Sequence, residues 1–254
     1  MHAMGDWVAA GGMGGELLVR RRAAGGLALA TTVAPGADGG GITNGVELSV
    51  GGSGRLRAVL SSNDCALREV DVATGRVSAR VDLGHPVNFA AACAAAPDLC
   101  VVAGDSREGA VVDLREDPAG GPAVRLLGHE DFNFAAAWHP AGHLVATGGQ
   151  DLSARVYDLR RGGGECAHRL GARMAAIRSL HFSSDGALLA AAEAADFVHL
   201  QSVADWGARQ EVDFFSEVSG AGFSPSGDAL FVGLAEPAFG GVLEFQRHPL
   251  SAGD

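Results

Sequence analysis

The chain has 254 residues and a formal net charge of −11, and 47% of its residues are hydrophobic. This length suits one large all-β domain or two smaller domains, and it allows a sizeable core. The negative charge argues against a nonspecific nucleic-acid surface, which needs a basic stripe to displace counterions from phosphates. The one basic run, residues 20–22, is too short to change that expectation.

Cysteine usage and hydropathy exclude further classes of protein. The four cysteines form no CxxC pair and no histidine lies at zinc-finger spacing, so we expect no metal site, no disulfide framework and no cofactor. The first seven residues lack the apolar core of a signal peptide, and no run reaches about 18 apolar residues. We therefore expect a cytoplasmic or nuclear protein without a membrane partner.

The first predicted elements are three short strands, over residues 7–10, 17–20 and 27–33. A glycine-rich run, residues 11–15, separates the first two. A nucleotide-binding loop follows a strand and opens a helix, whereas another strand pattern follows this run, so we interpret it as a turn. Residues 35–41 read as a glycine-rich linker.

Beyond the linker the chain repeats itself. A strand ending in a turn closed by glycine recurs with steps of 44 and 41 residues, at Gly142, Gly186 and Gly227. An acidic residue closing the next strand recurs with steps of 41, 46 and 45 residues, at Asp64, Asp105, Asp151 and Asp196. Two independent markers thus share a period of about 40 to 45 residues, which is typical of the four-stranded blades of a β-propeller.

Two segments compete with this interpretation. Residues 89–96 and 186–195 are rich in alanine and favour helix by intrinsic propensity. Both lie in phase with the repeat, where strands are due. Because propensity is a weak signal, we predict strands in both segments.

The most complete unit opens at Gly128-His129 and closes at Tyr157-Asp158. Its Gly-His opening, the run from Ala146 to Asp151 and its closing dipeptide resemble the GH, A-[ST]-G-x-x-D and WD elements of WD-repeat proteins, with Tyr157 in place of Trp. The chain as a whole resembles an uncharacterised group of WD-repeat, transducin-like proteins of plants and fungi. The matching segments are 7–12, 62–64, 104–106, 134–140, 194–199 and 243–245.

The predicted fold is therefore all-β, a single WD-repeat propeller over residues 1–254 built from four-stranded antiparallel blades. The expected division is a partial blade over 5–33, full blades over 42–83, 84–127, 128–171 and 172–215, a partial blade over 216–247 and a tail over 248–254. About six blades are covered, and the predicted strands fall short of the roughly 24 of a six-bladed ring and the roughly 28 of a seven-bladed one. An open ring leaves unpaired edges, so we expect an N-terminally truncated chain, with a six-bladed ring as the alternative.

Four polar residues of the best unit invite a catalytic interpretation. His129, Thr147 and Asp151 are residue types of a catalytic triad. The resemblance to WD-repeat proteins instead implies that they form, with Tyr157, a structural chain of hydrogen bonds. We adopt that interpretation and expect no catalytic residues, because buried polar groups need partners.

Surface recognition is the function that remains, so we expect a non-enzymatic scaffold or adaptor for other proteins. In propellers the loops that join one blade to the next gather with the second-to-third-strand turns on one face. The partner-contact candidates on that face are Phe132, Asn133, Arg173, Met174, Phe215 and Glu217, although the phenylalanines could equally pack between blades.

Two narrower functions follow from particular residues. Receptors of cullin-RING ubiquitin ligases end a repeat in W-D-x-R, which residues 157–160 resemble, and this makes Asp158 and Arg160 candidate contacts for the ligase adaptor. The alternative function is a small-molecule-binding or hydrolytic propeller that uses its central channel. It needs convergent carboxylates or histidines, and the predicted first strands begin almost without them, at Asn44, Val87, Phe132, Ile177 and Val218.

Overall fold

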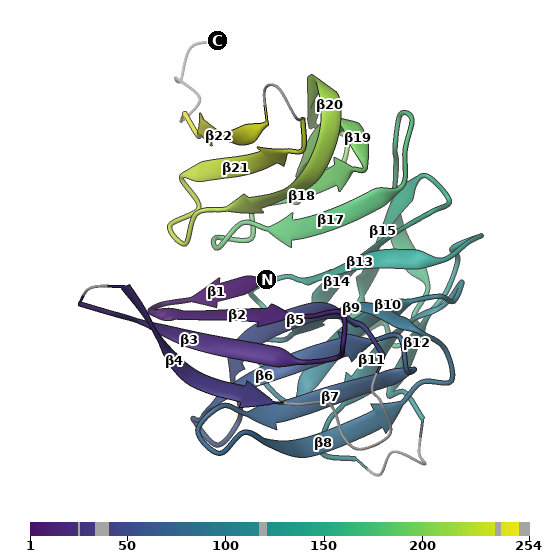
Figure 1. The fold of residues 1–254 in the computed structure, drawn as a ribbon. Coiled ribbons are helices and arrows are strands. Elements are labelled where there is room, and N and C mark those ends of the chain that lie inside the picture. Colours follow the sequence, from purple (N-terminus) through teal and green to yellow (C-terminus); the bar gives the residue numbers. More distant parts are fainter. Residues whose placement is uncertain (25, 34–40, 117–120, 237–239, 249–254) are drawn as a thin grey trace.

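The computed structural model describes residues 1–24, 26–33, 41–116, 121–236 and 240–248. They form an all-β molecule in which antiparallel sheets follow one another as the blades of a β-propeller (Figure 1). Blades 1 to 4 are four-stranded and consecutive along the chain. The predicted fold class is confirmed.

Within each of these four blades the strands follow one another in chain order from the central axis outwards. Blade 1 holds β1 (His2–Met4), β2 (Trp7–Gly11), β3 (Leu17–Ala23) and β4 (Gly26–Val33). Blade 2 holds β5 (Thr43–Val50), β6 (Leu56–Ser62), β7 (Ala66–Asp71) and β8 (Arg76–Asp82). Blade 3 holds β9 (Val87–Ala92), β10 (Leu99–Gly104), β11 (Gly109–Asp113) and β12 (Val124–Leu126). Blade 4 holds β13 (Asn133–Trp138), β14 (Leu144–Gly149), β15 (Ser153–Asp158) and β16 (Cys166–Gly171), with the short 3-10 helix η2 (Leu159–Arg161) after β15.

The last sheet has six strands because one long strand serves two blades. Its members are β17 (Ile177–Phe182), β18 (Leu188–Glu193), β19 (Ala195–Ser202), β20 (Arg209–Phe223), β21 (Ala229–Leu234) and β22 (Gly241–Gln246). The first part of β20 pairs with β19 and the last part pairs with β21. Blade 5 therefore comprises β17 to β19 and the start of β20, and blade 6 comprises the end of β20, β21 and β22.

The first strand of each blade lies next to the first strand of the following blade, from β1 through β5, β9, β13 and β17 to the end of β20. These inner strands surround the central axis. The two alanine-rich segments are strands, β9 and β18, so the prediction made from the repeat holds there. Tertiary pairing overrides helix propensity at both places.

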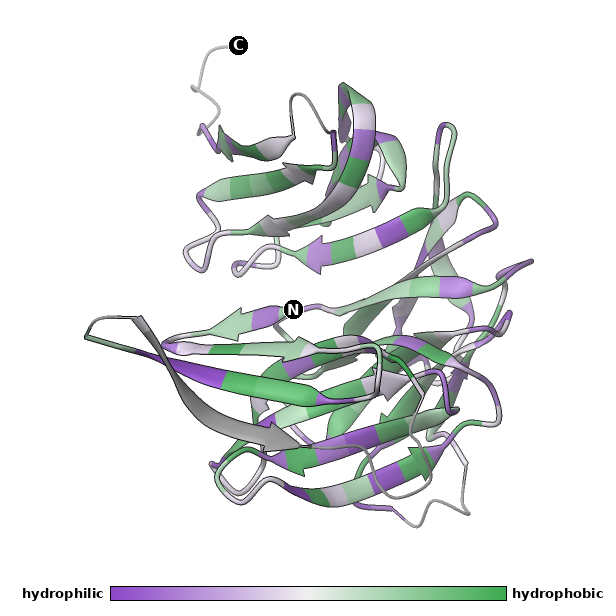
Figure 2. Ribbon diagram, viewed as in Figure 1, coloured by the Kyte–Doolittle hydropathy of each residue, from purple (hydrophilic) through white to green (hydrophobic). Residues whose placement is uncertain are grey.

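Among the described residues, five hydrophobic clusters hold the blades together, one at each interface between successive blades. Adjacent residues of a strand face opposite neighbours, as the pleat requires. On β14, Val145 belongs to the cluster shared with blade 3, whereas Ala146 belongs to the cluster shared with blade 5. Figure 2 shows apolar residues concentrated along the strands and hydrophilic residues in many of the turns.

One feature at the N-terminal end of the series differs from the expectations. The N-terminal unit has a fourth strand, β1, where the sequence analysis expected a partial blade over residues 5–33. Three residues are too few to show a period of two, which is why β1 escaped notice. Among the described residues, no strand pairing joins blade 1 to blade 6.

Candidate functional site

The four polar residues predicted to form a chain do lie together in blade 4. His129, in the loop before β13, contacts Asp151 (Nδ1 to Oδ2, 3.0 Å) and Thr147 (Nε2 to Oγ1, 2.8 Å). The hydroxyls of Thr147 and Tyr157 are 3.5 Å apart, which makes this the longest link. Asp151 also accepts hydrogen bonds from the backbone N–H of Glu130 and the hydroxyl of Ser153. The chain thus ties the entry loop of blade 4 to its second and third strands.

Charge and burial decide where the protons sit. Burial lowers the pKa of His129 despite the neighbouring Asp151 carboxylate, so its imidazole is neutral near pH 7. Burial alone would raise the pKa of Asp151, but its hydrogen bonds from Ser153 and Glu130 outweigh that effect and lower it. Because the carboxylate can only accept, Nδ1 of His129 carries the proton and Nε2 accepts from Thr147. Thr147 then has no proton left, so its oxygen accepts from Tyr157.

The same geometry disfavours a triad. The Thr147 and Tyr157 side chains are completely buried, and His129 is nearly so. Because Thr147 is completely buried on β14, its hydroxyl cannot reach the carbonyl of a substrate. What the arrangement can do chemically is satisfy buried polar groups and fix the entry loop.

Blade 5 carries a different polar cluster that the sequence analysis missed. Glu193, at the end of β18, is fully buried and accepts the backbone N–H groups of Arg173, Met174 and Ala175 at 2.6–2.8 Å. It also contacts Nε2 of His199 at 2.6 Å. Glu193 pairs with β17 as Gly149 pairs with β13, so it occupies a position where blade 4 has glycine. The repeat pattern used to recognise the blades contains Gly-His and Asp but no glutamate at this position. The only sequence signal for the cluster was an acidic residue at the end of an otherwise apolar strand.

Exposed apolar side chains gather on the face formed by the blade-to-blade loops and the second-to-third-strand turns. Three of them lie where one blade passes into the next: Phe132 before β13, Met174 before β17 and Phe215 within β20. Their side chains are 45%, 67% and 86% exposed, respectively, and that of Leu152, in the turn between β14 and β15, is 40% exposed. Backbone hydrogen bonds join these loops, since Gln150 donates to Phe132 and Ala172 donates to Leu152. We call Phe132, Leu152, Met174 and Phe215 the apolar row. Phe132 and Phe215 therefore do not pack between blades, whereas Phe214 does, against Phe245.

The other candidates on this face behave differently. Asn133 is completely buried and donates to the carbonyl of Ser106 at 2.7 Å, so its expected role as a partner contact is corrected to a link between blades 3 and 4. Arg173 is exposed but bonded to Glu211 at 2.8 Å. Glu217 is exposed.

The Asp158–Arg160 pair closes β15. Arg160 donates its backbone N–H and its Nε to Asp158 Oδ1, and its Nη2 lies 2.7 Å from Oδ2. The guanidinium lowers the pKa of Asp158 to about 2. Asp113 and Arg115 repeat this arrangement after β11. The recurrence shows that x-Asp-Leu-Arg has a local structural role.

Around the central axis, side chains of one inner strand satisfy the backbone of the next. Asn44 and Asn88 donate from Nδ2 to the carbonyls of Val87 and Asn133, both at 2.9 Å. Glu47 Oε1 accepts the N–H of Ala92 at 3.1 Å, and burial raises the pKa of Glu47 to about 8. No three His, Cys, Asp or Glu side chains among the described residues are placed to hold a metal ion together. Within the same residues, no helix is long and apolar enough to cross a membrane.

Comparison with known families agrees with this geometry. Residues 121–158 match the family model described as WD domain, G-beta repeat. Residues 121–158 are therefore similar to a WD repeat, and they lie within a β-propeller. The matched segment spans β12 and then β13 to β15, so the sequence repeat is offset by one strand from the structural blade. No curated protein matches the chain. The narrower resemblance to a plant and fungal group stays a prediction.

Proposed function

We propose that the chain is a non-enzymatic interaction scaffold that binds other proteins with the apolar row of blades 4 to 6. WD-repeat propellers generally bind other proteins, which supports the class of function. The observation that carries the proposal is the exposure of Phe132, Met174 and Phe215 on three successive blade boundaries. Aromatic and Met side chains are enriched in protein interfaces, and solvated apolar groups of this size gain free energy when a partner covers them.

Backbone strain at the row supports the same proposal. Phe215 has φ of 49° and Leu152 has φ of 56°, a left-handed conformation that costs a non-glycine residue about 1–2 kcal/mol. The Phe215 side chain is 86% exposed, so it does not regain that cost through burial within the chain. Strained residues persist where the surrounding structure or a function requires them.

The proposal is tested by affinity capture with the full chain and with the double variant Phe132→Ala, Phe215→Ala. We expect the variant to fold and to lose most of the partners captured by the natural chain. Val50→Ala is the matched control, because Val50 is also exposed but lies at the turn between β5 and β6, at the opposite end of the strands. Unchanged partners with intact folding would remove the apolar row from consideration.

A narrower proposal is that the chain is a substrate receptor of a cullin-RING ubiquitin ligase, acting in the cytoplasm or nucleus. Its support is the run from Tyr157 to Arg160, with the Arg160 side chain largely exposed and only one edge of its guanidinium bound to Asp158. Arg160→Ala is expected to abolish co-purification of the ligase adaptor, and Arg115→Ala, in the equivalent pair of blade 3, is the control. If the Arg160→Ala variant still co-purifies with the adaptor, this proposal is wrong.

The alternative function, ligand binding or hydrolysis in the central channel, has weaker support. Glu47 and the nearby asparagines are already bonded to backbone groups of the next inner strand. Turnover in a substrate screen that is lost in Glu47→Gln would favour this alternative over the scaffold.

A further inference from the structure

The two phenylalanines of the apolar row lie beside acidic side chains that have no basic partner among the described residues. Four carboxylates lie within two positions of Phe132 or Phe215 along the chain, and all four are exposed: Glu130, Asp131, Asp213 and Glu217. None of them takes part in an ion pair between described residues. We call these four residues the acidic rim.

Two members of the acidic rim are fixed beside the exposed rings by the same local geometry. Oδ1 of Asp131 accepts the backbone N–H of Phe132 at 2.8 Å, and Oδ1 of Asp213 accepts the backbone N–H of Phe215 at 3.1 Å. Each exposed phenylalanine therefore has a carboxylate held next to it. The surface offered to a partner combines apolar and negative groups at two separate blade boundaries.

Acidic residues on the same face of blades 2 and 3 are neutralised within the chain. Asp64, in the turn after β6, pairs with Arg68, and Glu108, in the turn after β10, lies 3.1 Å from Arg125. Arg107 is an exposed cation in that blade 3 turn and marks the limit of the acidic surface. The excess of negative charge is thus local to the blades that carry the apolar row.

The basic groups of blade 5 are engaged with other partners. The chain contains no lysine, so arginine is its only permanent cation. Arg173 and Arg209 each lie 2.8 Å from a carboxylate oxygen of Glu211. The guanidinium of Arg178 lies over the ring of Phe134, 4.5 Å from its centroid. None of the three arginines neutralises the acidic rim.

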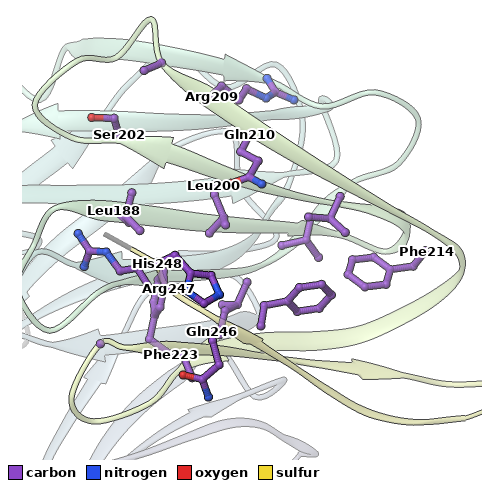
Figure 3. Close-up of a pocket in the computed structure, with 17 residues that line it drawn as sticks. Leu188, Leu200, Ser202, Arg209, Gln210, Phe214, Phe223, Gln246, Arg247 and His248 are labelled. Carbon is purple, nitrogen blue, oxygen red and sulfur yellow. The ribbon is translucent and has the colours of Figure 1, made fainter. Parts of the chain in front are cut away.

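The single arginine of blade 6 lies at the other end of the strands. Arg247 follows β22 and is 2.7 Å from Asp185, which lies in the turn between β17 and β18. Arg209 and Arg247 both line a cavity of about 740 Å³ between blades 5 and 6 (Figure 3). Blades 5 and 6 therefore leave the acidic rim without counterions of their own, and a partner that covers the apolar row has to supply them.

We infer that the partner segment bound by the apolar row is basic, with Lys or Arg side chains next to its apolar anchors that pair with the acidic rim. The inference rests on the proposed function and adds the chemistry of the partner. Burial of apolar anchors supplies affinity, and charge complementarity adds specificity and faster association. The same negative charge repels nucleic acids and anionic membranes.

The test uses a fluorescent probe peptide, Gly-Lys-Phe-Lys-Gly-Lys-Phe-Lys, whose binding to the full chain is measured by fluorescence anisotropy. One control peptide has Glu in place of every Lys, and the other has Ala in place of every Phe. We expect the probe to bind at least about tenfold more tightly than the Glu peptide and at least about fivefold more tightly than the Ala peptide. Equal binding of the probe and the Glu peptide, or no binding of the probe at millimolar concentration, would overturn the inference.

Two matched double variants separate the acidic rim from the net charge of −11. Glu130→Gln with Glu217→Gln removes two charges from the rim. Glu116→Gln with Glu165→Gln removes two exposed charges between the third and fourth strands of blades 3 and 4, at the opposite end of the strands. We expect the rim variant to bind the probe about fivefold to tenfold more weakly and the control variant to change by less than about twofold. Equal losses would show attraction to net charge alone and overturn the inference.

The Phe132→Ala, Phe215→Ala variant distinguishes this inference from the proposed function. We expect it to weaken probe binding as the rim variant does. Probe binding that is lost in the phenylalanine variant but kept in the rim variant would leave the proposed function standing and contradict only the basic partner. Loss in the rim variant alone would contradict both. A dimer that forms at micromolar concentration in analytical ultracentrifugation and dissociates in the rim variant would assign the surface to a second copy of the chain and overturn the inference.

Discussion

At the scale of single residues, polar groups in this molecule connect neighbouring structural units. His129 joins a loop to two strands, Asn133 joins blade 4 to blade 3, and Glu47 joins β5 to β9. Each is buried or partly buried in a mainly apolar interface. Such groups contribute little net stability when satisfied and cost much more when a partner is removed.

Glu47 makes the stability of the propeller depend on pH. Its pKa of about 8 lies above the ordinary value of 4.5, so the folded state holds this proton more tightly than the unfolded state. The stabilisation is complete below about pH 4.5 and is lost as the pH rises through 8. Glu47→Gln keeps an acceptor for Ala92 without a charge. We expect it to be more stable than the natural chain at pH 9, on the order of 1–2 kcal/mol, and about equal at pH 5.

Urea unfolding at several pH values measures this difference. Glu165→Gln, at an exposed position, is the control and should follow the natural chain throughout. A Glu47→Gln variant that is less stable than the natural chain at pH 9 would show that the carboxylate stabilises the blade interface instead.

The hydrogen-bonded residues of blade 4 are expected to contribute unequally to the free energy of unfolding. Thr147→Val keeps the shape but leaves Nε2 of His129 buried without a partner, which we expect to cost about 1–3 kcal/mol. Tyr157→Phe removes only the 3.5 Å link and should cost less than about 1 kcal/mol. Free energies of unfolding from urea titration decide between them. A larger cost for Tyr157→Phe would mean that the hydroxyl of Tyr157 matters more than its distance indicates.

At the scale of elements, the strands and turns that follow the repeat were predictable from the sequence, and the features that depart from the repeat were not. The recurring glycines and aspartates located the hairpins, because tight turns need those residue types at fixed intervals. The continuity of β20 was not predictable. It includes a left-handed backbone conformation at Phe215, and no sequence pattern indicates such a conformation at a phenylalanine. The Glu193 cluster was missed for a related reason: it satisfies the loop of blade 5 with a residue type that the repeat does not use there.

Replacing Phe215, the residue with positive φ in β20, by glycine is expected to make the folded protein more stable. Phe215→Gly removes the cost of the left-handed conformation, and little burial is lost because the side chain is exposed. Glycine also increases the entropy of the unfolded chain, which offsets part of the gain. We expect a net gain of up to about 1 kcal/mol by thermal or urea unfolding, together with loss of the partners bound by the apolar row. A loss of stability would show that Phe215 packs usefully on the chain itself.

At the scale of the whole molecule, the five interface clusters give the propeller a nearly one-dimensional architecture. Each blade is stabilised mainly by its neighbours, as in other repeat proteins. Blades 2 to 5 have a described neighbour on both sides. Within the described residues, blade 6 has three strands and packs on blade 5, and a cavity lies between the two blades.

Local stability should therefore fall from the middle of the series toward blade 6. Opening of β21 and β22 exposes one interface cluster, whereas opening of β14 and β15 exposes two and also breaks the His129 chain. Native-state hydrogen exchange at increasing urea concentrations is expected to show lower opening free energies for β21 and β22 than for β14 and β15. Equal protection in both blades would contradict this gradient and indicate that the molecule unfolds as one cooperative unit.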